Sequence, residues 1–218
     1  MSDQIKPSTF TRKYLIINEV LNAVTHGIGV ILSIIALVFL IQKGLEMGGL
    51  VELTSYTIYG VSLILLYLSS TLYHSFTFTR AKQVFQIIDH SSIFLLIAGT
   101  YTPYTLITIG GNLGIFLTIL IWTIAFLGVL YKTVWFKKFQ GLSVWLYIAM
   151  GWISIFFIHY LYQGLGTRGF IWLVAGGLSF TVGALFYRLK HVKYMHVVWH
   201  LFVLTGTILM FFSIYLYT

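Results

Sequence analysis

The last hydrophobic segment of the chain reads HVVWHLFVLTGTILMFFSIYLY and covers residues 196–217. Its length is close to the roughly 20 apolar residues that an α-helix needs to cross a bilayer. Two of its residues, His196 and His200, are four positions apart, so on a helix they point the same way at a separation of about 6 Å. An imidazole in hydrocarbon is unfavourable unless something binds it, and a metal ion is the natural candidate.

The amino-acid composition indicates that the chain lies in a membrane. Its 218 residues are 59% hydrophobic and 8% charged, with a mean hydropathy of +0.93. A soluble domain of this size could not hydrate such a surface, so we expect an all-α membrane protein with a single domain over residues 1–218. Residues 1–18 are too polar for a cleaved signal peptide and are expected to lie at the membrane interface. There is no cysteine, so a metal site must use His, Asp or Glu.

Seven hydrophobic segments predict a seven-transmembrane helix bundle. They cover residues 22–41, 53–74, 86–108, 113–131, 142–162, 170–187 and 196–217. If the segments alternate in direction, eleven Lys and Arg residues share one side of the membrane, and only Lys43 and Arg168 lie on the other. The positive-inside rule then predicts a cytoplasmic N-terminus and an extracellular C-terminus. Membrane topology thereby explains the net charge of +8, and we expect no nucleic-acid partner.

Several polar side chains are expected at one depth near the cytoplasmic face. Measured from the nearest cytoplasmic charge, His74 and Asp89 lie roughly 9 and 10 Å inward at about 1.5 Å per helical residue. The histidine pair of segment 196–217 lies roughly 5 and 10 Å inward by the same measure. Three imidazoles with one open position are typical of catalytic zinc, so His74, His196 and His200 are the predicted ligands. Asp89 is expected to hold water at the metal, with a hydrogen bond from Ser70 nearby.

A second polar stripe lies in the first hydrophobic segment. Glu19, Asn22 and His26 are spaced i, i+3 and i+7, so they share one face of a helix. Glu19 is a candidate for orienting a ligand histidine from behind, but the stripe is equally consistent with a polar seam that holds this helix in the bundle. His26 lies roughly 20 Å from the nearest cytoplasmic charge, deeper than the predicted ligands, and is not expected to bind the metal.

These motifs are, in order, Glu19-x-x-Asn22-x-x-Thr25-His26, Ser70-x-x-x-His74, Asp89 and His196-x-x-x-His200. Together they resemble the hemolysin III family, which is grouped with the progestin and adiponectin receptors (PAQR) and, more distantly, with the alkaline ceramidases. The resemblance covers all seven segments. It implies a seven-helix bundle with a cytoplasmic N-terminus, zinc on the three histidines, and Asp89 and Ser70 beside the water at the metal. The short N-terminal region is similar to the bacterial branch, which implies a bacterial plasma membrane.

Three functions are compatible with this pattern. The leading hypothesis is a zinc-dependent hydrolase of lipid amide or ester bonds, with Asp89 moving the proton and the acyl chain lying between helices near Pro103. A hemolysin-like pore former that causes cytolysis is the second, and it would require a homo-oligomer, which the sequence leaves open. The third is a sensor or receptor in which zinc is structural. In each case the expected partner is a membrane lipid, as substrate or ligand.

Overall fold

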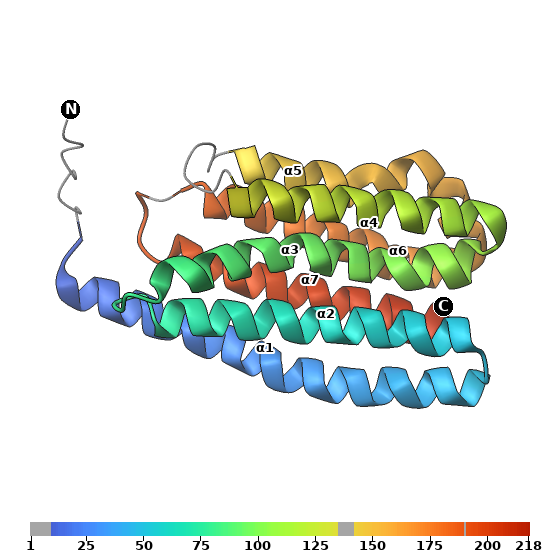
Figure 1. Ribbon diagram of the computed structural model, residues 1–218, viewed down its shortest axis with the longest axis horizontal. Helices are drawn as coiled ribbons and strands as arrows, with labels where there is room; N and C mark the ends of the chain where they lie inside the picture. The colour runs from blue at the N-terminus through green and yellow to red at the C-terminus, as the bar shows by residue number, and fades with distance from the viewer. Residues whose placement is uncertain (1–9, 135–141, 190) are drawn as a thin grey trace.

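The long helices of the protein run side by side along one axis (Figure 1). The computed structural model describes residues 10–134, 142–189 and 191–218, and every regular element within these ranges is helical. In chain order the elements are α1 (Arg12–Met47), α2 (Leu50–Ser75), α3 (Lys82–Pro103), the π-helical η1 (Tyr104–Ile109), α4 (Gly111–Val134), α5 (Leu142–Gly151), the 3₁₀-helical η2 (Trp152–Phe157), α6 (Ile158–Tyr187) and α7 (Met195–Tyr217).

Six helical stretches of the described chain are long and apolar enough to cross a membrane, which confirms a multi-pass membrane protein. Five of them each contain one of the predicted segments. The other, Leu142–Tyr187, has 46 residues and contains the predicted segments 142–162 and 170–187. A continuous helix of that length would be about twice as long as a bilayer core is thick. Gly166 has a non-helical backbone there (φ 63°, ψ 177°), and the ribbon doubles back within the stretch (Figure 1).

Helix α1 has a polar face toward the bundle and an apolar face on the outside. It begins after Thr11, whose hydroxyl accepts a hydrogen bond from the amide of Tyr14, and it ends at Gly48 with φ 73°. The first nine residues, part of the predicted interfacial segment, lie outside the described residues, and 12–18 are already helical. The buried side chains of α1 are mostly small or polar: Asn18, Asn22, His26, Gly29, Ser33, Leu40 and Gly44. The stripe expected in the sequence therefore faces the bundle.

The middle of the chain contains a tight turn and a change of helix type. Gly110 and Gly111 have φ of 65° and 57°, values that favour glycine, and they join η1 to α4 between the predicted segments 86–108 and 113–131. Pro103 has no amide proton to donate, and at this point α3 gives way to the π-helical η1. The side chains of Thr102, Pro103 and Tyr104 are all buried, so the change of helix type lies inside the bundle.

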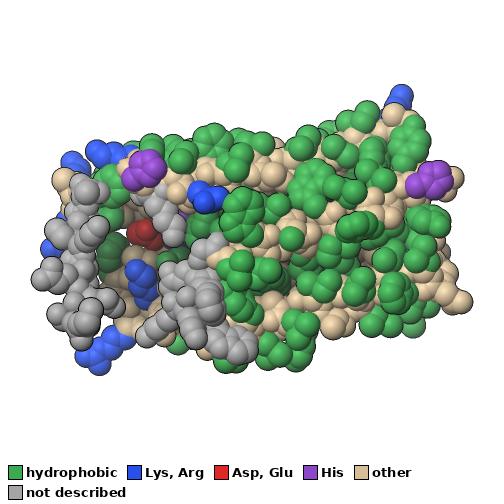
Figure 2. All heavy atoms as spheres, turned by 90° about the horizontal axis from the view of Figure 1, so that it is seen from above, with side chains coloured by type: hydrophobic (Ala, Val, Ile, Leu, Met, Phe, Trp, Pro, Cys, Tyr) green, Lys and Arg blue, Asp and Glu red, His purple; other side chains and the backbone are tan. Residues whose placement is uncertain are grey.

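The outer surface shows how the bundle matches a bilayer. Hydrophobic side chains cover the middle of the face seen in Figure 2, and Lys and Arg side chains gather mainly at one of its ends. Large exposed apolar residues are found on every long helix, for example Ile31, Phe116 and Ile171. The protein thus presents hydrocarbon where lipid tails would lie, and its interior keeps the polar side chains.

Candidate metal centre

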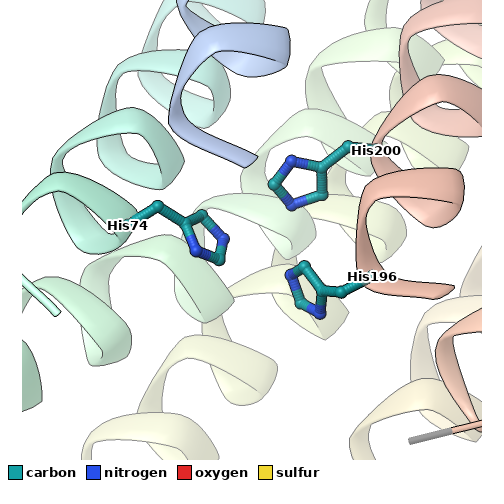
Figure 3. Close-up of side chains that lie close together, drawn as sticks. All are labelled: His74, His196 and His200. Carbon is teal, nitrogen blue, oxygen red and sulfur yellow. The ribbon is translucent and has the colours of Figure 1, made fainter. Parts of the chain in front are cut away.

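Three histidines from two helices meet inside the bundle (Figure 3). His74 lies in the last turn of α2, and His196 and His200 lie in the first two turns of α7. Each ring offers a nitrogen within 4.8 Å of those of the other two. The ring centroids are 4.7–5.0 Å apart. The sequence prediction that α2 and α7 bring their histidines to one depth therefore agrees with the structure.

The partner of His74 determines which of its nitrogens faces the cluster. Its Nδ1 is 2.7 Å from Oε2 of Glu19, the first residue of the α1 stripe. A carboxylate only accepts, so Nδ1 donates its proton to Glu19 and the lone pair is on Nε2. This Nε2 is buried and has no hydrogen-bond partner among the described residues. A histidine with a carboxylate behind it and an unused buried nitrogen in front is the usual arrangement of a metal ligand.

His200 is oriented by two acceptors of α1. Its Nδ1 lies 3.2 Å from the carbonyl oxygen of Asn22 and 3.3 Å from Oγ1 of Thr25. The Thr25 hydroxyl already donates to carbonyl oxygens of its own helix, at 2.9 Å and 3.0 Å, so it can accept from His200. Nδ1 therefore carries the proton, and the lone pair of Nε2 is available on the other side of the ring.

The donor set fits zinc. His74 and His200 are buried and His196 is partly buried, next to Tyr187 at a ring distance of 5.4 Å. Imidazole nitrogen suits zinc and other borderline transition metals, whereas magnesium and calcium prefer oxygen. Three protein ligands leave one coordination position open, as in catalytic zinc sites.

Asp89 lies beside this cluster but does not belong to it. Its buried side chain, on α3, accepts a hydrogen bond from Ser70 and interacts electrostatically with His74 and Lys132. Two further hydrogen bonds fix the backbone around it, because Ser92 Oγ donates to the Asp89 carbonyl at 2.6 Å and lies 3.0 Å from Ser69 Oγ of α2. The Asp89 carboxylate is thus close to the imidazoles without being one of the possible metal ligands.

Comparison with known proteins places these residues in a family. The family model described as haemolysin-III related matches residues 14–211, which include all the residues named above. The chain belongs to the haemolysin-III-related family. It is 46% identical over 204 residues to the "Hemolysin-3 homolog" of Bacillus subtilis (strain 168), covering 94% of this chain and 96% of the relative. It is 47% identical over 199 residues to "Hemolysin-3" of Bacillus cereus, with 91% of each covered.

A more distant relative extends the comparison beyond bacteria. The human "Monocyte to macrophage differentiation factor" is 26% identical over 166 residues, which are 73% of this chain and 68% of that protein. The family resemblance expected from the sequence motifs is therefore confirmed for this haemolysin-III-related protein.

The α1 stripe of the haemolysin-III-related protein combines both interpretations left open by the sequence. Glu19 orients His74, whereas Asn22 supports His200 through its backbone carbonyl and not through its side chain. His26 stacks on the His200 ring, with centroids 3.5 Å apart and planes 10° apart, and meets the edge of Tyr67 at 5.0 Å. It lies outside the group of possible metal ligands, but its stacking on His200 corrects the depth estimate, which placed it deeper than the ligands because α1 and α7 were measured from different charges.

Lys132 is the residue of this region that sequence reasoning missed. In the sequence it is only one of the eleven positive charges expected on the cytoplasmic side, just after the predicted segment 113–131. In the structure it lies in the last turn of α4 with 3% of its surface exposed, and it interacts electrostatically with Asp89. No sequence signal distinguishes this inward orientation, because a lysine at the end of a membrane helix usually extends toward the interface.

Proposed function

We propose that this protein is a zinc-dependent hydrolase that cleaves amide or ester bonds of membrane lipids. One observation carries the proposal: three imidazoles converge, two of them with their rear nitrogens held by α1, while a buried carboxylate lies next to them without joining them. A purely structural site commonly has four protein ligands, whereas an incomplete set beside an acid or base is typical of hydrolysis.

Each residue of the site then has a defined task. His74, His196 and His200 would hold the ion, and Glu19 would keep His74 in the tautomer that can bind it. A zinc ion in such a site supplies Lewis acidity and lowers the pKa of a nearby water toward about 7. Enclosure within the helices would keep bulk water away from the substrate carbonyl, which strengthens every electrostatic interaction there.

Asp89 would move the proton. As general base it would accept a proton from the attacking water, whose oxygen bonds to the acyl carbon. It would then return that proton to the departing nitrogen or oxygen as the amide or ester bond breaks, which leaves a fatty acid and an amine or alcohol. Ser70 would orient the carboxylate through its hydrogen bond, and Lys132 would stabilise its ionised form. Buried carboxylates inside a membrane are rare and call for such partners.

The proposal includes a seven-span topology with a cytoplasmic N-terminus. It is supported by the excess of Lys and Arg on one side in the alternating arrangement, and by the opposite ends of the bundle at which α1 starts and α7 finishes (Figure 1). Because the sequence has no cysteine, single cysteines can report the side of each loop. Labelling of Ser2→Cys by an impermeant maleimide on intact cells would contradict this orientation.

Hydrolysis can be tested with purified protein in lipid nanodiscs at known zinc content. The wild type is expected to release fatty acid from at least one lipid in a panel of N-acyl and O-acyl lipids. Asp89→Asn should abolish release while zinc remains bound, because Asp89 is not a ligand. Glu46→Gln, at an exposed position on α1, is a matched control that should leave the rate unchanged. A wild type with full zinc that releases nothing from the whole panel would overturn the proposal.

Membrane lysis is a second candidate because the Bacillus cereus relative is named a hemolysin. A pore would require several copies of the chain, since the histidine cluster and the carboxylates beside it gather at one end of the bundle and do not line a path through it. Leakage of dye from liposomes distinguishes the two functions. Leakage that persists in His74→Ala and His196→Ala favours a pore that is independent of the metal centre, and leakage that follows the metal content favours the consequence of lipid hydrolysis.

A further inference from the structure

Two fully enclosed side chains next to the metal centre have unused hydrogen-bonding groups. Asn22 is 0% exposed and His26 is 3% exposed. Within the described part of the chain, neither the side-chain amide of Asn22 nor either ring nitrogen of His26 has a hydrogen-bond partner. A buried polar group without a partner destabilises the fold, and here there are two such side chains in a membrane interior. Such groups usually indicate a ligand or water that completes them.

An apolar groove begins one helical turn further along α1. It lies among α1, α2 and α7, has a volume of about 260 Å³, and is lined mainly by aliphatic and aromatic side chains such as Leu32, Phe39, Leu204 and Phe211. Its few hydroxyl groups are already engaged, because Ser33 donates to the Gly29 carbonyl and Tyr67 shares a hydrogen bond with Thr207. The groove therefore offers contacts to hydrocarbon only.

The polar pair and the groove adjoin each other through Tyr67. The same inner stripe of α1 runs from Asn22 and His26 to Gly29 and Ser33, and Asn22 is about 10 Å from Gly29 along the helix. Gly29 lines the groove, and the Tyr67 ring lies against its bare backbone. The same Tyr67 ring meets the edge of His26, which stacks on His200. A path from the metal centre to the groove thus passes the two unpartnered side chains and the ring of Tyr67.

We propose that this region is the binding site for one single-chain lipid amide or ester, with its hydrocarbon chain in the groove and its polar group hydrogen-bonded to Asn22 and His26. An amide offers both a donor and an acceptor, which is what the Asn22 amide and a neutral imidazole require. Rotation of the Tyr67 ring away from Gly29 joins the two compartments. The inference rests on the proposed function for the identity of the lipid, and it places the chain at α1 and α7 instead of near Pro103.

Photolabelling tests the site without any need for turnover. The probe is a long-chain fatty amide that carries a diazirine at mid-chain and a terminal alkyne, added to zinc-loaded protein in nanodiscs. Adducts are expected on groove residues of α1 and α7, such as Phe39 and Phe211, and unlabelled amide should suppress them. Ala36→Trp, which fills the groove, should lower specific labelling about tenfold, whereas Ala149→Trp on the exposed surface of α5 should not. Adducts spread evenly over the lipid-facing helices would show annular lipid only and would overturn the proposal.

The polar half of the site has its own readout. In the wild type, the fatty amide should compete with the probe about tenfold better than an alkane of equal length, which is the effect of one or two buried hydrogen bonds. In Asn22→Leu combined with His26→Phe this preference should disappear, while the alkane competes as before. A preference that survives the double variant would refute the roles of Asn22 and His26. Groove labelling without hydrolysis would contradict only the proposed reaction, and hydrolysis with labelling elsewhere would contradict only this site.

Discussion

At one end of the bundle Lys43 is surrounded by acceptors, whereas near the other end Asn22 and His26 have no partner among the described residues. The Lys43 ammonium donates to the carbonyl oxygens of Ile214, Tyr215 and Thr218 at 2.8–3.2 Å. It also lies 5.0 Å from the centroid of the Tyr56 ring. All three of its donors are used, at the end of α7 where the helix dipole favours a positive charge.

The metal end of the same helices is built differently. There, Nε2 of His74 and the side chains of Asn22 and His26 are buried with unused polar atoms. Both regions are held between α1 and α7, about 36 Å apart along α1 as measured from Glu19 to Lys43. Where every buried donor has an acceptor, as at Lys43, the contacts serve to stabilise the fold. Where buried polar atoms have no partner, as at Asn22 and His26, we expect a ligand to bind. We therefore expect substitutions at the metal end to change zinc binding and substitutions at the Lys43 end to change stability.

The largest expected effect is the loss of metal in His200→Ala. The group of possible ligands found among the described residues contains three imidazoles, so removal of one leaves two, which hold a divalent ion weakly. Protein purified with zinc in all buffers should contain close to one equivalent as wild type and almost none as His200→Ala, measured by plasma mass spectrometry. His159→Ala removes a histidine on α6 outside the cluster and is the matched control. Equal zinc in wild type and His200→Ala would refute the site.

Much of this centre could be predicted from the sequence because helix geometry is regular. Spacing of four places His196 and His200 on one face, and counting residues from the nearest charge places His74 at their depth. The same regularity identified the stripe that starts at Glu19. These inferences need only the rise of a helix and the thickness of a bilayer, and the observed cluster agrees with them.

The remaining features depend on packing between helices, which a periodic pattern does not encode. Whether Lys132 turns inward to Asp89 or outward to the interface is decided by the neighbours of α4. The sequence places the Asn22 side chain in the polar stripe of α1, whereas it is the backbone carbonyl of Asn22 that contacts His200. The groove beside Gly29 likewise involves residues of several helices, and the Tyr67 ring lies where a Cβ on Gly29 would be. Each of these facts joins residues from different helices.

An intermediate effect is expected for Glu19→Gln. The amide can still contact His74 Nδ1 but carries no negative charge, so the imidazole becomes a weaker electron donor to the metal. Zinc affinity should fall about tenfold, at the low end of the range typical of such outer partners, as measured by competition with a fluorescent chelator. Val20→Ala, one position later on α1 at an exposed site, provides a control for local disturbance of the helix. Unchanged affinity in Glu19→Gln would favour the interpretation of this residue as a polar seam only.

The smallest effect, and the one that separates the two ends, is expected for Lys43→Met. Methionine keeps much of the aliphatic length but removes the three charge-assisted hydrogen bonds to the end of α7. The resulting loss in unfolding free energy should be about 1–2 kcal/mol, since exposed carbonyls at the interface regain water. It is measured as a lower apparent midpoint of thermal unfolding in detergent, at fixed heating rate. Zinc content and affinity should not change, because the metal ligands depend on contacts at the opposite end of α1. If Lys43→Met lowered both zinc content and stability, the two ends of α1 would be coupled. The distinction between a stabilising site at Lys43 and a ligand-binding site at the metal end would then be wrong.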